Sequence, residues 1–540
     1  MSAFPVSRET RWVQSTVVLL ALLAVLAGCA VGPDYVKPTV AEPQAWSESQ
    51  DPALPGEQAD FSRWWTVFAD PVLDSLIEKA HANNPGLQAA GIRILEARAQ
   101  LGIATGSLYP QIQQLRGDLL AVGGSENSAN TTPSADLQYG ETGVGFDMAW
   151  ELDFWGKFSK AVAAGVGNLD ASIANYDDIL VTLTAEVARI YARVRTFEAR
   201  LAITRENVAI QTRSLEIATV RFKGNEVTEL DVAQARTLLA NTQASIPRLE
   251  STLRQSKNAL ALLLGLFPAE LEAMLTGPSN IPSAPAEVAV GIPADMLRRR
   301  PDVREVERRL LAQNALTGVA EADLYPRLSL VGSVGLRSSS ADITAAGFPG
   351  GSNLGDVFDS SSVEYLFGPA LSWDIFNYGR IKNRIRVEDA RFQQLAEAYR
   401  NTVLKAVREV EDASVAFLRS QLESTYLAES ASAAARSVEL AMLQYKEGLA
   451  DYQRVLDTQR ALAAQQDVLT TSRGDIAVNL VALYKALGGG WEVRKGKPFA
   501  PEATRKEMAQ RTDWGNLLDE EIDTTPAPEK EKRQWRPPDW

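Results

Sequence analysis

The chain has 540 residues, of which 55 are basic and 68 acidic, for a formal net charge of −13. This acidic balance and the lack of a basic tract exclude a typical nucleic-acid-binding protein. The single histidine, His81, has no second imidazole or thiol to share a metal, and no phosphate-binding loop or catalytic constellation stands out. We therefore expect neither an enzyme nor a cofactor. Because the 45% of hydrophobic residues are spread evenly, repetition explains the length better than several domains do.

Residues 1–28 have the features of a secretory signal peptide. Arg8 and Arg11 precede an apolar run, 17–27, that is too short to span a bilayer permanently. The run and Cys29 resemble a bacterial lipoprotein signal, which implies cleavage before Cys29 and a covalent lipid on its thiol. Each buried methylene of that lipid would add about 0.8 kcal/mol to membrane retention. Ala30 stands where inner-membrane lipoproteins usually carry aspartate, so we expect the outer membrane; the alternative is an ordinary signal peptide with a chance cysteine.

An alanine-rich helix is predicted from Asp70 to Leu108, ending at Tyr109-Pro110 because proline disfavours the α conformation in the preceding residue. Strands follow. The segment from Val144 to Phe154 alternates apolar and polar side chains. In a soluble protein this alternation indicates a half-buried sheet. In a membrane barrel the apolar face would meet lipid and the polar face a water-filled lumen.

A very long helix is predicted from Lys157 to Phe222. Apolar residues recur at three-four spacing, which is a heptad seam, and the helix would measure about 100 Å at 1.5 Å per residue. The chain then returns through Thr228 to Leu264, about 55 Å of helix. Such a seam alone indicates a coiled coil. Beside a pair of strands it suggests a helical tube that continues a barrel.

The second half of the chain repeats the first. Asn84-Pro85 to Tyr109-Pro110 returns as Arg300-Pro301 to Tyr325-Pro326, displaced by 216, and the later part returns displaced by 223. At the second displacement Trp150 matches Trp373, Gly156 matches Gly379 and Phe222 matches Tyr445. The chain is therefore one structural unit written twice, with the first repeat at 70–280 and the second at 281–490.

The repeat also supplies a second strand pair. Leu328, Leu330, Val334 and Leu336 line one side of the strand after Tyr325-Pro326, and Leu371, Trp373 and Ile375 alternate with polar residues. Four strands cannot close a barrel, and an open sheet edge leaves backbone groups unsatisfied in lipid. A spanning chain must therefore oligomerise, and three copies would supply twelve strands.

Several motifs together carry a family resemblance. They are Val31-Gly32-Pro33-Asp34-Tyr35, Trp64-Trp65 with Asp70-Pro71, Arg299-Arg300-Pro301-Asp302, the paired Tyr-Pro dipeptides, and the run from Tyr484 to Gly490-Trp491. From Cys29 to about Trp491 the chain resembles the outer-membrane lipoprotein factors of tripartite RND-type efflux systems, the NodT/OprM-like branch of the TolC superfamily.

The resemblance implies a membrane α+β fold. A homotrimer would form a 12-stranded β-barrel, with four strands per protomer, continued by a 12-helix periplasmic α-barrel. A mixed equatorial region would include residues near 40–69, 266–299 and 489–505. The segment 29–69 would be acylated and partly equatorial, and 491–540 would complete that region and end in a disordered tail, because no apolar periodicity follows Trp491.

The resemblance also assigns roles to the two helical turns. The tips, with Phe222, Gly224, Asn225, Thr228, Gly448 and Leu449, would dock a periplasmic adaptor, or would simply be solvated turns. Asn225 stands where relatives usually have glycine, and asparagine is the next best residue for a left-handed turn. Tyr445 and Lys446 fall where relatives lock the helices shut.

The resemblance places the periplasmic gate just after the second tip. Asp457 falls on the acidic ring position, where three carboxylates would repel and favour cations. The alternative is an outward Asp457 paired with Arg454 or Arg460. Gln453 stands where relatives have an apolar residue, three copies of which close the pore as a ring. A ring of polar glutamine amides would exclude water less well.

The favoured function is a passive outer-membrane exit duct of a tripartite pump, lipid-anchored and extending into the periplasm, which exports drugs or other small molecules. Its partners would be the periplasmic adaptor (membrane fusion protein), an inner-membrane RND-type transporter and outer-membrane lipid. Two alternatives stay open. One is a TolC-like duct for type I protein secretion, and the other is a non-channel, lipid-anchored scaffold, which would leave the amphipathic strands unexplained.

Overall fold

The computed structural model describes residues 31–41, 43–55, 60–127, 137–276, 279–291, 293–341 and 353–518. The elements follow one order twice. The first repeat contains α2 (Pro71–Asn83), α3 (Pro85–Gly106), β1 (Ile112–Gly123), β2 (Gln138–Glu151), α4 (Lys157–Lys223) and α5 (Glu229–Leu263). The second contains α7 (Pro293–Arg299), α8 (Pro301–Ala322), β3 (Arg327–Ser339), β4 (Val363–Ser372), α9 (Arg380–Lys446) and α10 (Tyr452–Ala486).

Matched helices have equal lengths in the two repeats. The long helices α4 and α9 have 67 residues each, the return helices α5 and α10 have 35, and α3 and α8 have 22. At 1.5 Å per residue the long helices measure about 100 Å. The predicted duplicated plan and the predicted span of the long helix are therefore confirmed.

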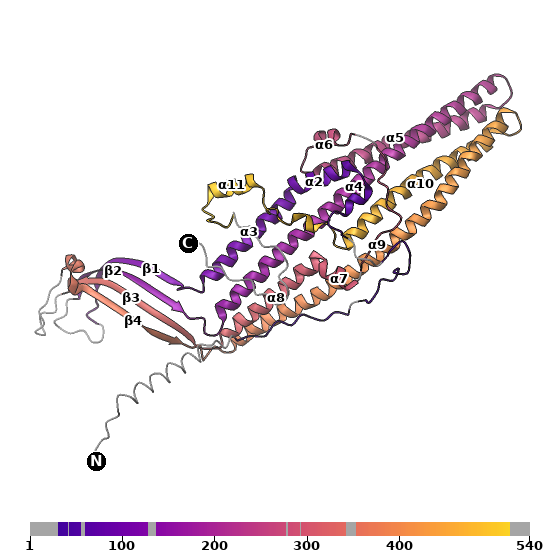
Figure 1. Ribbon diagram of the computed structural model, residues 1–540. Helices are drawn as coiled ribbons and strands as arrows, with labels where there is room; N and C mark the ends of the chain where they lie inside the picture. Colours follow the sequence, from indigo (N-terminus) through magenta and orange to yellow (C-terminus); the bar gives the residue numbers. More distant parts are fainter. Residues whose placement is uncertain are drawn as a thin grey trace, which may run out of the picture.

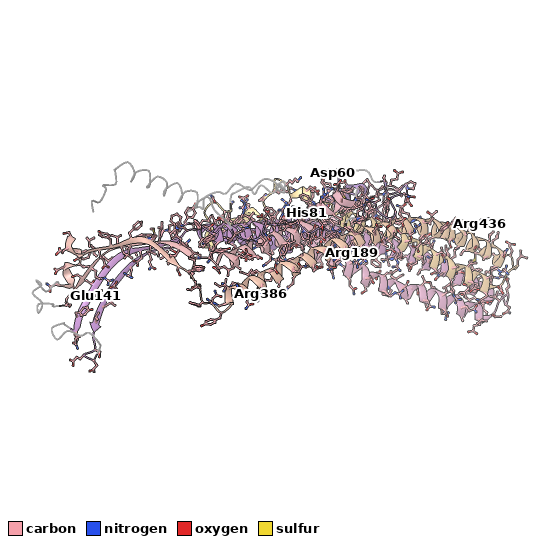
Figure 2. The ribbon with its side chains drawn as sticks, turned by 90° about the horizontal axis from the view of Figure 1, so that it is seen from below. Asp60, His81, Glu141, Arg189, Arg386 and Arg436 are labelled. Carbon is pink, nitrogen blue, oxygen red and sulfur yellow. The ribbon has the colours of Figure 1, made fainter. Side chains whose placement is uncertain are left out.

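The protein is elongated, with the sheet at one end and two helical hairpins at the other (Figure 1). Hairpin α4–α5 belongs to the first repeat and hairpin α9–α10 to the second. Glu141 lies in the curved sheet and Arg436 lies toward the opposite end, near the tips of the hairpins (Figure 2). Helices α2, α3 and α5 all pack along α4, so the shorter helices together match the long one in length.

The four strands form one antiparallel sheet in the order β1-β2-β3-β4. The register aligns Leu115, Phe146, Val334 and Tyr365 in one row across the sheet. All four side chains are exposed. The opposite face carries the charged side chains of the sheet, and there Arg337 forms ion pairs with Glu141 at 2.6 Å and Glu364 at 3.2 Å. The sheet therefore has one exposed apolar face and one charged face, as the alternation predicts.

Two predicted strands end earlier than expected. β2 ends at Glu151, so Leu152 and Phe154 lie beyond it, and β4 ends at Ser372, before Trp373 and Ile375. Near the end of each strand, whether inside it (Trp150) or just beyond it (Trp373), a tryptophan indole donates to the carbonyl that precedes a Tyr-Pro dipeptide. Trp150 Nε1 donates to the Leu108 carbonyl at 3.1 Å and Trp373 Nε1 to that of Leu324 at 2.9 Å.

The predicted helix from Asp70 to Leu108 is two helices, because Pro85 cannot donate a backbone hydrogen bond and its ring restricts Asn84. Asn84 is extended at ψ 119° and its Nδ2 donates to the Leu263 carbonyl at the end of α5, at 2.9 Å. The second repeat makes the matching contact, since the Arg300 guanidinium donates to the Ala486 carbonyl at the end of α10, at 2.6 Å. At each break, a side chain is therefore hydrogen-bonded to the end of the return helix of the same repeat.

The middle of the molecule is a mixed region that surrounds the helices. It contains the short helices η1 (Trp64–Phe68), α6 (Pro268–Met274), η5 (Trp491–Arg494) and α11 (Glu502–Arg511). Trp64 stacks on Tyr484 with ring centroids 5.1 Å apart, and Val288 donates to the Ala53 carbonyl at 2.8 Å. Arg299 also pairs with Glu492 at 2.6 Å, so the three segments that the resemblance assigns to an equatorial region meet here.

The described part of the C-terminal segment is ordered, contrary to the predicted disordered tail. Met508 of α11 is buried against Leu95 of α3, and Arg98 donates to the Leu517 carbonyl at 2.8 Å. A few apolar contacts fix this arm, so no apolar periodicity is needed. Residues 519–540 and the signal peptide lie outside the described residues. None of the helices in the described ranges has an apolar stretch of the length needed to traverse a lipid bilayer.

Candidate functional site at the helical tips

The two hairpin turns have the same backbone geometry. In the first, Asn225 has a left-handed φ of 61° and the Glu226 amide donates to the Arg221 carbonyl at 3.0 Å. In the second, Gly448 has φ 73° and the Leu449 amide donates to the Gln444 carbonyl at 2.9 Å. Both are Schellman-type ends, which need a residue that tolerates positive φ. Asparagine thus keeps the turn, as predicted.

The helices that leave the turns are capped at matching positions. Thr228 forms a capping box with Asp231, and the Asp451 carboxylate accepts from the Arg454 amide at 3.2 Å. These bonds satisfy amides at the start of α5 and α10. The predicted tip residues therefore form two ordered turns, in which Phe222 and Leu449 expose apolar side chains at the far end of the molecule.

Arg221 connects the two hairpins. Its guanidinium donates to the backbone carbonyl of Tyr445, lies 4.7 Å from the centre of the Tyr445 ring, and pairs with Glu226 at 3.0 Å. The Tyr445 ring packs edge-on against Tyr452 at 5.3 Å, and the Tyr452 hydroxyl lies 3.1 Å from Ser214 Oγ on α4. Burial raises the pKa of both tyrosines, so both stay neutral at physiological pH.

The predicted gate residues fall into two groups. Gln453 Nε2 donates to both carboxylate oxygens of Asp457, at 3.0 and 3.1 Å, and Arg460 lies 3.6 Å from the same carboxylate. Asp457 is 58% exposed, so this pairing leaves it open to solvent. Tyr445, in contrast, is buried and belongs to the Arg221 contact. The structure therefore brings Gln453 and Asp457 together and separates them from Tyr445.

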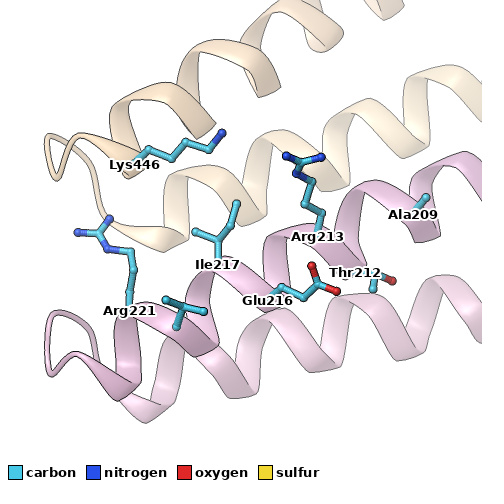
Figure 3. Close-up of a pocket in the computed structure, with 8 residues that line it drawn as sticks. Ala209, Thr212, Arg213, Glu216, Ile217, Arg221 and Lys446 are labelled. Atoms are coloured by element: carbon cyan, nitrogen blue, oxygen red, sulfur yellow. The ribbon is translucent and has the colours of Figure 1, made fainter.

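Lys446 lies on an open groove of about 820 Å³ between α4 and α9. Figure 3 shows Lys446 on one helix and Arg213, Glu216 and Arg221 on the other. Three cationic groups and one carboxylate line the groove, so its net charge is positive. Such a surface favours acidic partners.

The sequence matches the family described as outer membrane efflux protein over residues 76–266 and 292–489. The chain belongs to this family. Nodulation protein T of Rhizobium leguminosarum bv. trifolii is 30% identical over 466 residues, which span 86% of this chain and 95% of that protein. The pyoverdine export outer membrane protein OpmQ of Pseudomonas putida is 31% identical, over 84% of this chain and 93% of the relative.

Solved structures agree with this membership of the outer membrane efflux protein family. The outer-membrane channel OprN superposes with a TM-score of 0.79 at 29% identity, covering 86% of this chain and all of that one. A crystal structure of CusC superposes with a TM-score of 0.73 at 27% identity, again over 86% of this chain. The predicted family and protomer fold are confirmed. The protein is an outer-membrane efflux channel protein that extends into the periplasm, and its relatives are channels rather than enzymes.

A polar seam between α4 and α10 joins the two repeats and is not among the features predicted from the sequence. Arg200 forms a two-pronged ion pair with Asp467 at 2.7 and 2.9 Å, and Asn207 Nδ2 donates to Gln466 Oε1 at 2.8 Å. Nearer the tips, Gln211 is buried. The signal was present, because Gln211 occupies a seam position of the predicted heptad where an apolar residue is usual.

Cys29 lies outside the described residues, but the chain is described from Val31. The Val31 amide donates to the Trp155 carbonyl at 3.1 Å, between β2 and α4. The described N-terminus is therefore held where the sheet meets the helices. Within the described ranges no cluster of three or more His, Cys, Asp or Glu side chains is arranged to hold a metal ion.

Proposed function

We propose that three copies of this chain form the passive exit duct of a tripartite efflux pump. One observation carries the proposal: a sheet with an exposed apolar face and a charged face is joined directly to helices about 100 Å long. Three four-stranded sheets would close into a twelve-stranded barrel with lipid outside and the charged face inside. A scaffold without a pore gives no reason for the row of exposed Leu115, Phe146, Val334 and Tyr365.

A lipid on Cys29 fits this arrangement. Because Val31 is bonded to Trp155 at the junction of sheet and helices, an acyl chain two residues away would lie at the level of the membrane surface. The lipid would anchor each copy beside its own strands. Mass spectrometry of the mature N-terminal peptide tests this step, because an unmodified Cys29 would exclude it.

The tips would dock the periplasmic adaptor. Phe222 and Leu449 expose apolar side chains there, and the cationic groove with Arg213, Arg221 and Lys446 lies beside them. The adaptor would connect the duct to an inner-membrane RND-type transporter, which supplies the energy. Substitution of Phe222 and Leu449 by serine should abolish adaptor cross-linking while leaving channel conductance in bilayers unchanged.

The cargo we propose is a small molecule. Relatives carry names as different as pyoverdine export, cation efflux and solvent efflux, so the family serves several cargoes. Type I protein secretion is the alternative. Deleting the gene should increase sensitivity to small toxic compounds if the protein is an efflux duct, whereas loss of a secreted protein with normal sensitivity would favour the alternative.

The test of the duct is single-channel conductance of the purified, acylated protein in planar bilayers, with Asp457→Ala beside the wild type. A small, cation-preferring conductance that rises or loses selectivity in the variant supports a gated duct with its acidic ring at Asp457. Well-folded protein without any conductance would exclude the duct. A variant that conducts like the wild type would keep the duct but exclude Asp457 from its gate.

A further inference from the structure

The long helix of the second repeat begins with a run of basic side chains. Arg380, Lys382, Arg384 and Arg386 lie in the first two turns of α9, and all four are exposed. We call these four residues the basic run. The segment 375–387 contains them and no acidic residue, although the whole chain has a net charge of −13. The basic run is therefore a local exception in an acidic protein.

The matching segment of the first repeat lacks this charge. At the displacement of 223, Ser159, Ala161 and Ala163 stand where the last three members of the basic run stand. Lys157, the counterpart of the first member, is already paired with Asp323 at 2.9 Å. A helix of equal length forms in the first repeat without the extra charges, so the fold does not require the basic run.

Carboxylates of the same chain neutralise little of the basic run. Within the described ranges Arg384 is its only member with an ion pair, to Asp323 at 3.4 Å, and its side chain is still 62% exposed. Arg386 donates to the neutral amide of Asn383 at 3.0 Å. Cations in the first turn of a helix are also opposed by the helix dipole. An anion beside the basic run would offset this cost.

Exposed apolar side chains come directly before the basic run. Ile375 is 61% exposed and Phe376 is 86% exposed. The counterpart of Phe376 in the first repeat is Asp153, whose carboxylate accepts from the Phe158 and Ser159 amides at 2.8 Å. The second repeat thus has an exposed aromatic ring where the first has a negative charge. Cations beside exposed apolar groups are typical of surfaces that bind the membrane interface.

The basic run also lies at the level of the membrane surface in the proposed orientation. β4 ends at Ser372 and α9 begins at Arg380, so only a short connection separates the run from the sheet. Figure 2 shows Arg386 where the helices approach the sheet. The Val31 amide, two residues from Cys29, is bonded at the same junction of sheet and helices. Lipid headgroups would therefore lie within reach of these side chains.

We propose that the basic run binds the headgroups of anionic phospholipids in the periplasmic leaflet of the outer membrane. The guanidinium and ammonium groups contact the phosphate oxygens, and Ile375 and Phe376 contact the upper part of the acyl chains. The occupant is a lipid rather than an acidic protein because exposed apolar side chains accompany the charges at the level of the membrane. This inference rests on the proposed membrane-spanning sheet and adds a preference for anionic lipid to it.

Native mass spectrometry of the full-length, acylated protein in detergent tests the lipid preference. The probes are phosphatidylglycerol, which is anionic, and phosphatidylethanolamine, which is zwitterionic. The variant Lys382→Ser/Arg384→Ala/Arg386→Ala gives α9 the residues of the first repeat. Each basic residue near an anionic surface strengthens binding roughly fivefold, so this variant should bind phosphatidylglycerol about 100-fold more weakly. Its binding of phosphatidylethanolamine should be unchanged.

Two control variants separate the position of the charges from their number and from folding. Arg400→Ala/Lys405→Ala/Arg408→Ala removes three exposed cations of α9 that lie about 20 Å or more farther along the helix. This distance exceeds the screening length of about 8 Å at physiological salt, so phosphatidylglycerol binding should equal that of the wild type. An equal loss in this control would overturn the assignment to the basic run.

The second control keeps the charges and changes only the side chains. Lys382→Arg/Arg384→Lys/Arg386→Lys should bind phosphatidylglycerol within a few-fold of the wild type. Loss of binding in this variant would mean that the charge is not what holds the lipid, and would contradict the proposal.

Inorganic phosphate distinguishes a lipid site from a simple anion site. At constant ionic strength, replacing chloride by phosphate should not displace phosphatidylglycerol, because phosphate has no acyl chain to contact Phe376. Complete displacement would overturn the assignment to a lipid.

The outcomes also separate this inference from the proposed function. If the variant with the residues of the first repeat is trimeric and conducts, yet binds phosphatidylglycerol like the wild type, the inference fails and the duct stays intact. Such a result would favour an acidic protein segment as the occupant of the basic run. Wild-type protein without conductance would overturn the duct and the membrane placement on which this inference rests.

Discussion

The guanidinium of Arg221, at the end of α4, is hydrogen-bonded to the backbone carbonyl of Tyr445, near the end of α9. The two residues are 224 positions apart and belong to different repeats. Their contact joins the two hairpins at their tips, beyond the Ser214–Tyr452 contact and the polar seam between α4 and α10. Any movement that separates the hairpins at this end must break it.

We predict that Arg221→Ala increases the open probability of the channel. A hydrogen bond to a charged group contributes about 1.5–3 kcal/mol, so its loss should shift the closed–open equilibrium by roughly 10- to 100-fold. Single-channel recording measures this. Arg205→Ala is the control, because Arg205 pairs with Glu250 inside the first hairpin at 2.9 Å. An equal effect of both variants would argue against a lock between hairpins.

Cation preference should depend on Asp457. We predict that Asp457→Asn reduces the ratio of cation to anion permeability several-fold, because three carboxylates around a narrow opening attract cations. Reversal potentials in a salt gradient measure the ratio. Asp451→Asn is the control, since asparagine also caps α10 and the helix is retained. If Asp451→Asn reduces the ratio as much as Asp457→Asn does, the acidic ring is not at Asp457.

His81 should make the protein less stable in acid. Its Nε2 lies 2.8 Å from Thr184 Oγ1, whose hydroxyl donates to the Leu180 carbonyl, so Nε2 is the donor to Thr184. Burial, assisted by Lys497, lowers the pKa of His81 to about 4. Between pH 6.5 and 4 the unfolded chain therefore binds a proton that the folded chain does not. The free energy of unfolding decreases by up to about 3 kcal/mol as the pH is lowered through this range.

The measurement is the melting temperature of wild type and His81→Gln at pH 7.5 and 4.5. Glutamine keeps a donor for Thr184 but does not titrate. The variant should lose less stability than the wild type between the two pH values. Equal losses would mean that His81 is accessible to protons in the folded state.

Asp178, in contrast to His81, should make the protein less stable at neutral pH than in mild acid. Burial and the neighbouring carboxylates of Asp302 and Glu305 raise its pKa to about 6. At neutral pH the ionised group therefore opposes folding by up to about 3 kcal/mol, and this cost is relieved as the pH falls through 6 toward 4. Asp178→Asn should raise the melting temperature at pH 7.5 and have little effect near pH 4.

Substitution of the adjacent residue, Asp177, should change stability in the opposite direction. Asp177 is fully buried and its carboxylate accepts a hydrogen bond from Arg494 at 3.0 Å. Asp177→Asn should destabilise the protein by about 3–5 kcal/mol, because it leaves a buried guanidinium without its counter-charge. Thermal unfolding at pH 7.5 should therefore give shifts of opposite sign for the two variants, and a decrease for both would contradict the assignment of Asp178.

The repeat, the long helices and the two-faced strands could be predicted because each depends on local periodicity. The break at Asn84-Pro85 could also have been predicted, since it follows the same proline rule that ended the helix before Tyr109-Pro110. The end of β2 could not, because the alternation of apolar and polar residues continues past Glu151 to Phe154. The order of residues 500–518 could not either, because it depends on a distant surface of α3.

The tip turns followed from the sequence because a left-handed residue is required at a fixed place, and Gly448 and Asn225 supply it. The role of Arg221 did not follow. An arginine near a helix end is usually solvated, and only packing of the hairpins brings this one to the Tyr445 carbonyl. The neighbours of Asp457, in contrast, lie within one helical turn, so local spacing alone is enough to predict its pairing with Arg460 as one alternative.

The duplication divides the assembly of the duct into two kinds of event. A chain with only one unit would need six copies, and every seam between units would form by collision. Here the seam between the two repeats, with its Arg200–Asp467 pair, forms as a single chain folds and does not depend on protein concentration. Only the seam between copies depends on protein concentration. Dilution should therefore separate copies long before it separates repeats.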